Sequence, residues 1–238
     1  ETGQRLAVQR INPYLVDAPD VLISRRSTPL CDVPEMSKGS QPSDGGNLIL
    51  SAAEREDLLQ KEPQAKAWIR EFIGADEFIN GYKRWCLWLA GVSPNELRQA
   101  PLTLARVQKV QSVRYASKYA VSISSNLSPA EFERIRQTEK PYLLIPRVSS
   151  ETRQFIPLGY LTAETICSDA AFMLPNATLF HFGMLCSTMH NAWMRTVAGR
   201  LKSDYRYSVH IVYNNFAWPS DVADDKRMAI TRAADAVL

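Results

Sequence analysis

Three charged side chains occupy alternate positions near the C-terminal end of the sequence: Lys202, Asp204 and Arg206. Alternate residues of an extended segment point to the same side of the backbone, so the three would form one row. Lysine and arginine only donate hydrogen bonds, and an ionised aspartate only accepts them. Such a row forms either weak surface ion pairs or hydrogen bonds to a partner whose surface offers both acceptors and donors. The three residues alone leave both interpretations open.

The composition indicates a globular protein. The chain has 238 residues, of which 45% are hydrophobic and 22% are charged, so it can bury a sizeable core. Its net charge of +3 is too small to indicate a polyanionic partner by itself. No signal region and no apolar run of about 18 residues is present, so we expect a soluble cytoplasmic protein with no membrane partner.

Enzymatic and metal-binding motifs are missing from the sequence. The four cysteines, Cys31, Cys86, Cys167 and Cys186, have no zinc-ligand spacing, and we expect reduced thiols in the core. No phosphate-loop, dinucleotide-binding or zinc-protease motif occurs. Cys186 could form a nucleophilic pair with His190, four residues away, but the sequence offers them no orienting acid or oxyanion hole. We therefore expect no catalytic residue and no metal in this chain.

The hydrophobic pattern predicts an α+β fold, in which short strands of a mixed or antiparallel sheet pack against helices. Ser51 and Glu54 have the spacing of a capping box at the start of a helical region. The stripe Met189, Trp193, Val197 and Leu201 is expected to be the buried face of another helix. We expect helices over residues 48–73, 93–120, 186–201 and 221–238, and extended segments over 11–26, 74–91, 141–150, 153–162, 169–185 and 207–219.

The helix expected over residues 93–120 has a one-sided charge. Its only acid is Glu96, against five basic residues: Arg98, Arg106, Lys109, Arg114 and Lys118. Leu104, Val107 and Val110 supply its apolar stripe. The basic residues form either an ordinary solvated face or a surface that faces phosphates.

Four long segments, in this order, resemble one protein family. They are "GADEFINGYKRWCLWL", "YLLIPRVSSETRQFIPLGYL", "DAAFMLPNATLFHFGMLCSTMHNAWMR" and "GRLKSDYRYSVHIVYNNFAWP". They are similar to the target recognition domain of MmeI-like enzymes, which are single-chain type II restriction-modification proteins, and of related class I adenine-specific DNA methyltransferases. The resemblance covers residues 11 to 220. It implies that residues 1–30 are the tail of a preceding methyltransferase domain, 31–220 the target recognition domain and 221–238 the start of a C-terminal helical segment.

The resemblance implies a function in which this chain selects DNA and catalysis happens elsewhere. It implies sequence-specific binding of double-stranded DNA for an N6-adenine methyltransferase of a bacterial restriction-modification system, located in the cytoplasm at the nucleoid. The parent would use S-adenosylmethionine, whereas this chain holds no cofactor, and the "NPY" at residues 12–14 is interpreted as a structural turn. The alternative is a protein-interaction or scaffold module whose basic helix docks an acidic partner.

The resemblance also implies roles for individual residues. Lys202 and Asp204 match a pair that fixes one base of the target, and a donor with an acceptor suits a G·C pair, because guanine offers N7 and O6 acceptors and cytosine an N4 donor. Arg206 matches a position that reads a neighbouring base, with Ala170 as its partner position. Candidate contacts to the DNA backbone are Arg114, Lys118, Arg147, Ser149, Ser150, Arg153 and Arg200, with Asn191 and Arg195 as weaker candidates.

Overall fold

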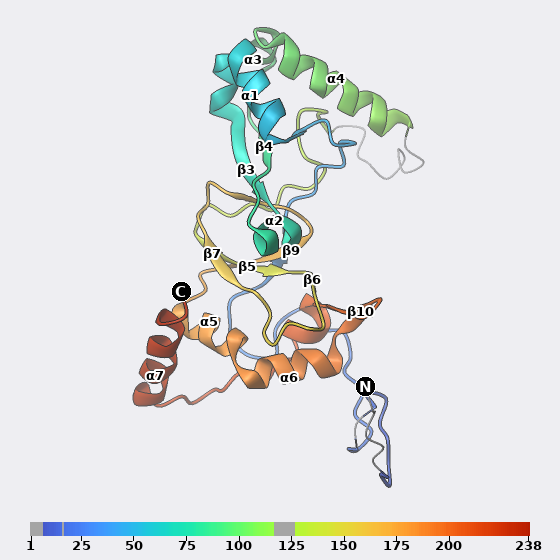
Figure 1. The fold of residues 1–238 in the computed structure, drawn as a ribbon, viewed down its shortest axis with the longest axis vertical. Helices are drawn as coiled ribbons and strands as arrows, with labels where there is room; N and C mark the ends of the chain where they lie inside the picture. The colour runs from blue at the N-terminus through green and yellow to red at the C-terminus, as the bar shows by residue number, and fades with distance from the viewer. Residues whose placement is uncertain (1–6, 16, 117–126) are drawn as a thin grey trace. The chain divides into compact units, whose positions relative to one another are not determined.

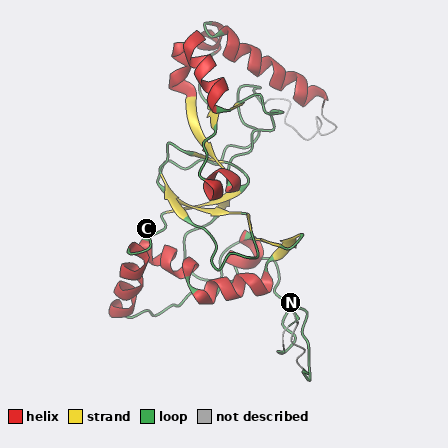
Figure 2. Cartoon of the chain, viewed as in Figure 1, coloured by secondary structure: helices red, strands yellow, loops and turns green. Residues whose placement is uncertain are grey.

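The computed structural model describes residues 7–15, 17–116 and 127–238. The chain folds as two compact units, each built from separate stretches of sequence (Figure 1). The two-sheet unit comprises Met36–Arg147 and Pro157–Ala177, and the hairpin unit comprises Glu1–Glu35, Val148–Ile156 and Thr178–Leu238. Helices and short strands both recur along the chain (Figure 2), which confirms the predicted α+β class.

The two-sheet unit contains two four-stranded sheets. The first has the order β1-β9-β5-β7 and is antiparallel throughout. The second has the order β2-β4-β3-β8, and its β3–β8 pair is parallel. The strands of this unit are β1 Ser37–Lys38, β2 Ile49–Leu50, β3 Ile69–Ile73, β4 Trp85–Leu87, β5 Tyr142–Pro146, β7 Gly159–Leu161, β8 Ile166–Cys167 and β9 Ala171–Pro175.

Helices and a buried apolar cluster stabilise the second of these sheets. Leu50, Phe72 and Leu87 from the sheet pack with Val107 and Val110 of α4 in this cluster. Two residues of the predicted stripe of that helix are therefore buried, and the third, Leu104, is partly buried. The predicted capping box is also confirmed, because Ser51 N–H donates to Glu54 Oε2 (2.9 Å) and Glu54 N–H to Ser51 Oγ (3.3 Å). The helices are α1 Ala52–Lys61, the 3-10 helix η1 Pro63–Trp68, α2 Ala75–Asn80, α3 Pro94–Arg98 and α4 Pro101–Ala116.

The strand predicted across residues 74–91 is wrong in its first half, which forms α2. Glu77 caps this helix, because the N–H of Gly74 donates to Glu77 Oε2 (2.8 Å). Gly81 ends it in the left-handed conformation (φ 72), which glycine adopts without a steric penalty. The two tryptophans dominate the apolar pattern of the segment, but only Trp85 lies in strand β4 and the helical signals precede it.

The hairpin unit contains one small sheet of order β10-β11-β6 together with its helices. Helices α5 and α7 pack against each other, and Gly183 of α5 lies so close to Ile230 of α7 that a Cβ at residue 183 would clash. The elements of this unit are β6 Val148–Ser149, α5 Leu179–Cys186, α6 Thr188–Val197, β10 Gly199–Leu201, β11 Asp204–Arg206, the π-helix η2 Val209–Tyr213 and α7 Asp224–Asp235.

Two further strand predictions are wrong in this unit. Residues 179–186 form helix α5, because a short apolar run fits a buried helix as well as a buried strand. Residues 209–213 alternate like a strand but form η2, in which the N–H groups of Tyr213 and Asn214 donate to carbonyls five residues back, those of Ser208 (3.2 Å) and Val209 (2.8 Å).

Helix α6 buries a different face from the one predicted. Its buried residues are His190, Asn191, Met194 and Val197, whereas Met189 is 73% exposed. The helix ends at Val197, so Leu201 lies in β10 and is 53% exposed. Of the predicted stripe, Val197 alone is fully buried, and the buried face is displaced by one residue. It includes His190, whose Nε2 contacts the Tyr207 hydroxyl (3.0 Å), and Asn191, whose Nδ2 donates to the carbonyl of Ser187 (2.9 Å).

Candidate nucleic-acid interface

The charged row lies on a β-hairpin, residues 199–206. Strands β10 and β11 pair antiparallel with Leu201 opposite Asp204 and Gly199 opposite Arg206, which leaves Lys202 and Ser203 as a two-residue turn. Asp204 and Arg206 therefore share one face of β11, as predicted. Lys202 does not continue that strand, because it occupies the turn with a φ of 56.

The hairpin exposes the groups that could read a base pair. Lys202 and Arg206 are exposed, and Asp204 is half-buried. One carboxylate oxygen of Asp204, Oδ1, accepts the backbone N–H of Glu151 at 3.4 Å. A donor at the turn and an acceptor beside it are the pair that the edge of a G·C pair requires.

The opposite face of the hairpin is occupied by Arg200 and Tyr205, which lie directly across from each other. The guanidinium carbon of Arg200 lies 3.8 Å from the centre of the Tyr205 ring. Arg200 Nη1 also donates to the carbonyl of Ser203 (2.7 Å) and forms an ion pair with Glu151 Oε2 (3.8 Å). Arg200 is therefore bound to the hairpin itself, in contrast to the free cation expected of a phosphate contact.

Ala170 belongs to the two-sheet unit, whereas Arg206 belongs to the hairpin unit. Ala170 is exposed and lies in the turn before β9, where its N–H donates to Ser168 Oγ (3.1 Å). Its role as the partner position of Arg206 stays a prediction.

Arg114 is not available to phosphates, so that assignment is wrong. Only 7% of the residue is exposed, and its guanidinium donates to four backbone carbonyls. These belong to Pro42 (3.0 Å), Ser43 (3.1 Å), Ser128 (3.0 Å) and Glu131 (2.6 Å). Arg114 thus fastens two loops to the end of α4, which is a structural function.

The basic helix offers fewer cations than its sequence suggests. Arg106 is paired with Glu54 (2.9 Å) and donates to the carbonyl of Asn47, while Lys109 is exposed. Lys118 lies outside the described residues. With Arg114 buried, the described part of α4 gives little support to docking on an acidic partner.

The candidates in and after β6 divide into exposed and engaged groups. Arg153 is exposed, and Ser150 uses its hydroxyl to hold the turn, contacting Thr152 Oγ1 at 2.9 Å. Ser149 is 7% exposed and pairs with Tyr205 across the sheet. Arg147, in the two-sheet unit, is half-buried and donates to the carbonyl of Asp169 (2.7 Å).

The two weaker candidates on α6 are structural residues. Asn191 is buried, and its Oδ1 accepts the N–H of Ile156 (2.9 Å) while its Nδ2 donates to the carbonyl of Ser187 (2.9 Å). Arg195 donates to the carbonyls of Arg153 and Gln154. Together they fasten residues 153–156 to the helix, so the assignment of Asn191 to the DNA backbone is wrong.

Burial disfavours the Cys186–His190 nucleophilic pair. It raises the pKa of the Cys186 thiol to about 11 and lowers the pKa of His190 to about 3, so neither side chain tends toward the charged form that catalysis needs. All four cysteines are free, but only Cys86 and Cys167 are buried as expected, whereas Cys31 and Cys186 are half-buried. Among the residues that the structure describes, no group of three His, Cys, Asp or Glu side chains could hold a metal, and no helix could span a membrane.

Sequence reasoning missed a pair of arginines in the hairpin unit. Residues 24–30, here called the strap, run against η2 and carry Arg25 and Arg26 with exposed side chains. The backbone of Arg26 is fixed by His210, since Arg26 N–H donates to the His210 carbonyl (3.1 Å) and the Arg26 carbonyl contacts His210 Nδ1 (2.9 Å). Asn214 Nδ2 also donates to the Arg26 carbonyl (3.0 Å). The adjacent arginines themselves were the available sequence signal.

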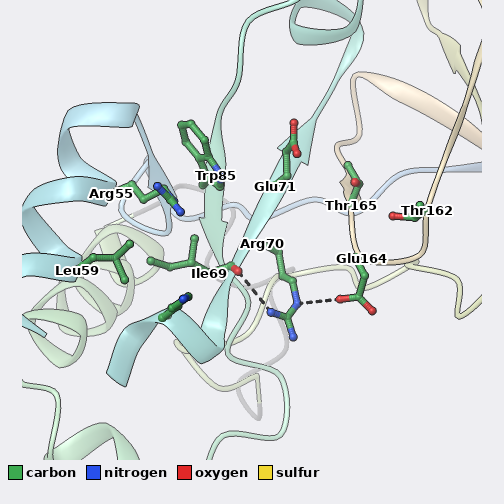
Figure 3. A pocket seen from close by; sticks show the side chains of 10 residues that line it. Arg55, Leu59, Ile69, Arg70, Glu71, Trp85, Thr162, Glu164 and Thr165 are labelled. Carbon is green, nitrogen blue, oxygen red and sulfur yellow. Dashed lines mark hydrogen bonds and ion pairs between the residues drawn. The ribbon is translucent and has the colours of Figure 1, made fainter. Parts of the chain in front are cut away.

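A cavity of about 440 Å³ in the two-sheet unit contains none of the expected site residues. Arg70, which donates to the carbonyl of Ile69 and pairs with Glu164 (3.6 Å), lies on its wall (Figure 3). Arg55 lies 5.1 Å from the centre of the Trp85 ring. Because this cavity contains none of the expected residues, the hairpin remains the better candidate for recognition.

Fold and hairpin together define an α+β binding module that presents charged side chains on a small sheet. The chain belongs to the family of MmeI target recognition domains, whose sequence model, "MmeI, target recognition domain", matches residues 17–220. It is 37% identical over 212 residues to DNA methyltransferase A of Bacillus subtilis (strain 168), covering 89% of this chain and 24% of that protein.

A solved structure is also similar, that of the Type IIL restriction-modification enzyme MmeI in complex with DNA. It has a TM-score of 0.94 and 44% sequence identity, over 99% of this chain and 32% of that chain. The chain thus spans about a quarter of one relative and about a third of the other.

Proposed function

We propose that this chain binds duplex DNA and supplies target specificity to an N6-adenine DNA methyltransferase of a restriction-modification system. The observation that carries the proposal is the hairpin of residues 199–206, which presents a lysine donor and an aspartate acceptor within a member of the MmeI target recognition domain family. The DNA complex of the similar MmeI enzyme and the similarity to a DNA methyltransferase support it.

The hairpin reads one base pair through complementary groups. The ammonium of Lys202 donates to guanine O6 or N7, and the carboxylate of Asp204 accepts from cytosine N4. Arg206, on the same face as Asp204, reads a neighbouring base, with Ala170 at its partner position. A correct pair of such contacts discriminates against other base pairs by about 1–3 kcal/mol.

Phosphate contacts hold the hairpin in register without reading sequence. Three exposed arginines of the hairpin unit, Arg25, Arg26 and Arg153, suit this role, because their side chains are open to solvent. The backbone of Arg26 contacts His210, which follows Arg206 by four residues. Four extended residues span at most about 14 Å, so the backbone contact of the strap at His210 is close to Arg206. Lys118 remains a further candidate.

The rest of the methyltransferase belongs to a longer parent protein. The chain covers only part of its relatives, and we place the catalytic domain, with its S-adenosylmethionine, in the same parent as this domain. The expected location is the bacterial cytoplasm at the nucleoid, where the substrate DNA lies.

An exchange of the two charges tests the proposal. Lys202→Glu with Asp204→Arg, made in the full-length parent, reverses the order of donor and acceptor, so one position of the methylated site changes from G·C to C·G. Mapping methylated adenines across the genome of the host measures this. An active double variant that methylates the original site contradicts the proposal.

The matched control is the exchange Asp57→Lys with Lys61→Asp. These residues form an exposed ion pair on α1 (2.7 Å), in the other unit, so the exchange preserves net charge and leaves the recognition site unchanged.

A further inference from the structure

We propose that Glu151 and Arg200 are positioning residues that fix the hairpin of residues 199–206 in the geometry that reads a base pair. This inference rests on the proposed function and extends it to two residues that touch no base. Arg200 was expected to contact the DNA backbone, and its contacts assign it a different role.

Arg200 fixes the turn that carries Lys202. Its Nη1 donates to the carbonyl of Ser203, the second residue of the turn, at 2.7 Å. Its guanidinium lies on the Tyr205 ring, at 3.8 Å from the ring centre, in a cross-strand pair. The planar arginine thus joins the two strands on the face away from Asp204, and it limits the directions in which the turn can move.

Glu151 connects the same face to the reading carboxylate. Its side chain pairs with Arg200 (3.8 Å), while its backbone N–H donates to Asp204 Oδ1 (3.4 Å). A carboxylate with one oxygen engaged has a restricted rotamer and keeps the other oxygen, Oδ2, for cytosine N4.

The loop that holds Glu151 is itself anchored. The Ser150 hydroxyl contacts Thr152 Oγ1, and the N–H of Arg153 donates to the Ser150 carbonyl (3.2 Å), which closes the turn around Glu151. Asn191 and Arg195 of α6 hold the residues that follow. Helix α6 therefore supports the reading pair through one loop.

The experiment compares Arg200→Met and Arg200→Lys in the full-length parent, with purified protein and duplexes that carry each of the four base pairs at one position. That position is the one whose specificity changes in the Lys202→Glu, Asp204→Arg variant. Lysine keeps the charge but lacks the planar guanidinium, with its fixed donors and its stacking on Tyr205. Both variants should therefore lose the positioning of the hairpin. A phosphate contact would survive in Arg200→Lys.

We expect both variants to lower the preference for the cognate base pair about tenfold, with the loss confined to that position. The thermal midpoint, measured in parallel, should change little, which separates positioning from loss of the fold. Glu151→Gln, which keeps the backbone donor, should give a smaller loss in the same direction.

Two results overturn the inference. One is an unchanged base-pair preference in both Arg200 variants while the charge exchange at Lys202 and Asp204 does alter it. The other is a uniform loss of affinity for all duplexes, with a lower salt dependence in Arg200→Met alone, since that describes a phosphate contact. If the charge exchange itself alters no base preference, the proposed function fails first, and the two failures are thus distinguishable.

Discussion

Lys202 and Asp204 are separated by one residue, yet their backbone conformations differ: Asp204 begins strand β11, and Lys202 adopts a φ of 56 in the turn before it. An L-residue in this left-handed region costs about 1–2 kcal/mol, and glycine is the residue that avoids the cost. The position therefore carries a side chain at the expense of local stability, which fits a role in recognition.

Lys202→Gly should stabilise the hairpin while removing its reading donor. We expect the free energy of opening to rise by about 0.5–1 kcal/mol, because the strain is relieved. Hydrogen exchange of the β10 and β11 amides measures the gain, and duplex binding measures the loss of base preference. Ser203→Gly, at a residue without positive φ, is the control and should give no gain. Faster exchange in Lys202→Gly than in the parent would contradict the expectation.

Arg114→Met should destabilise the two-sheet unit by about 3 kcal/mol or more. The change leaves up to four backbone carbonyls without their donor, and each buried unsatisfied acceptor costs about 1–3 kcal/mol. Denaturant unfolding of the full chain measures this. Lys109→Met, exposed on the same helix, should change stability by less than about 0.5 kcal/mol. A stable Arg114→Met with weaker salt dependence of DNA binding would restore Arg114 as a phosphate contact.

Arg25→Ala with Arg26→Ala should weaken binding to all duplexes alike. Loss of two phosphate contacts lowers the slope of log K against log salt concentration by about 1.8, and the preferred sequence does not change. Affinity measured at several salt concentrations gives the slope. Arg25→Lys with Arg26→Lys keeps both charges and should keep the slope. Equal slopes for the alanine variant and the parent would exclude the strap from the phosphate contacts.

His190 should make the stability depend on pH. Its pKa is about 3 when folded, against 6.5 for the free group, so the unfolded state binds the proton more readily. The stability that neutral His190 supplies is complete above about pH 6.5 and is lost as the pH falls toward 3, by about 1.4 kcal/mol per pH unit.

The comparison with His190→Gln is best made between pH 6.5 and 5, before most carboxylates titrate. Denaturant unfolding at several pH values should show a shallower slope in the variant. The slope does not vanish, because burial also lowers the pKa of His181. Parallel curves for parent and variant would show that His190 is not responsible.

Local patterns in the sequence predicted those features that local interactions decide. The capping box at Ser51 and Glu54 depends on residues three apart, and the common face of Asp204 and Arg206 depends on residues two apart. The turn at residues 12–14 is also confirmed, because the N–H of Tyr14 donates to Asn12 Oδ1 (2.9 Å). Each needs no knowledge of the rest of the chain.

Features that depend on distant partners could not be predicted in the same way. Arg114 looks like any exposed cation until Pro42 and Glu131 are brought to it by the fold. The segment 209–213 has strand-like alternation, but the strap and Trp193, whose Nε1 donates to the Val212 carbonyl (2.8 Å), occupy the groups that a neighbouring strand would need. The domain boundaries at residues 31 and 220 stay a prediction.

The β10–β11 hairpin is attached to its sheet through only two ladder positions, Tyr205 opposite Ser149 and Arg206 opposite Val148. A segment with so few pairs to its sheet can be exchanged between relatives as a unit, since its outer face contributes little to the core. This unit is discontinuous in sequence, however, because Glu151 comes from a loop about fifty residues earlier in the chain and still contacts Asp204. A graft of residues 199–206 should therefore transfer specificity faithfully only when residues 148–151 travel with it.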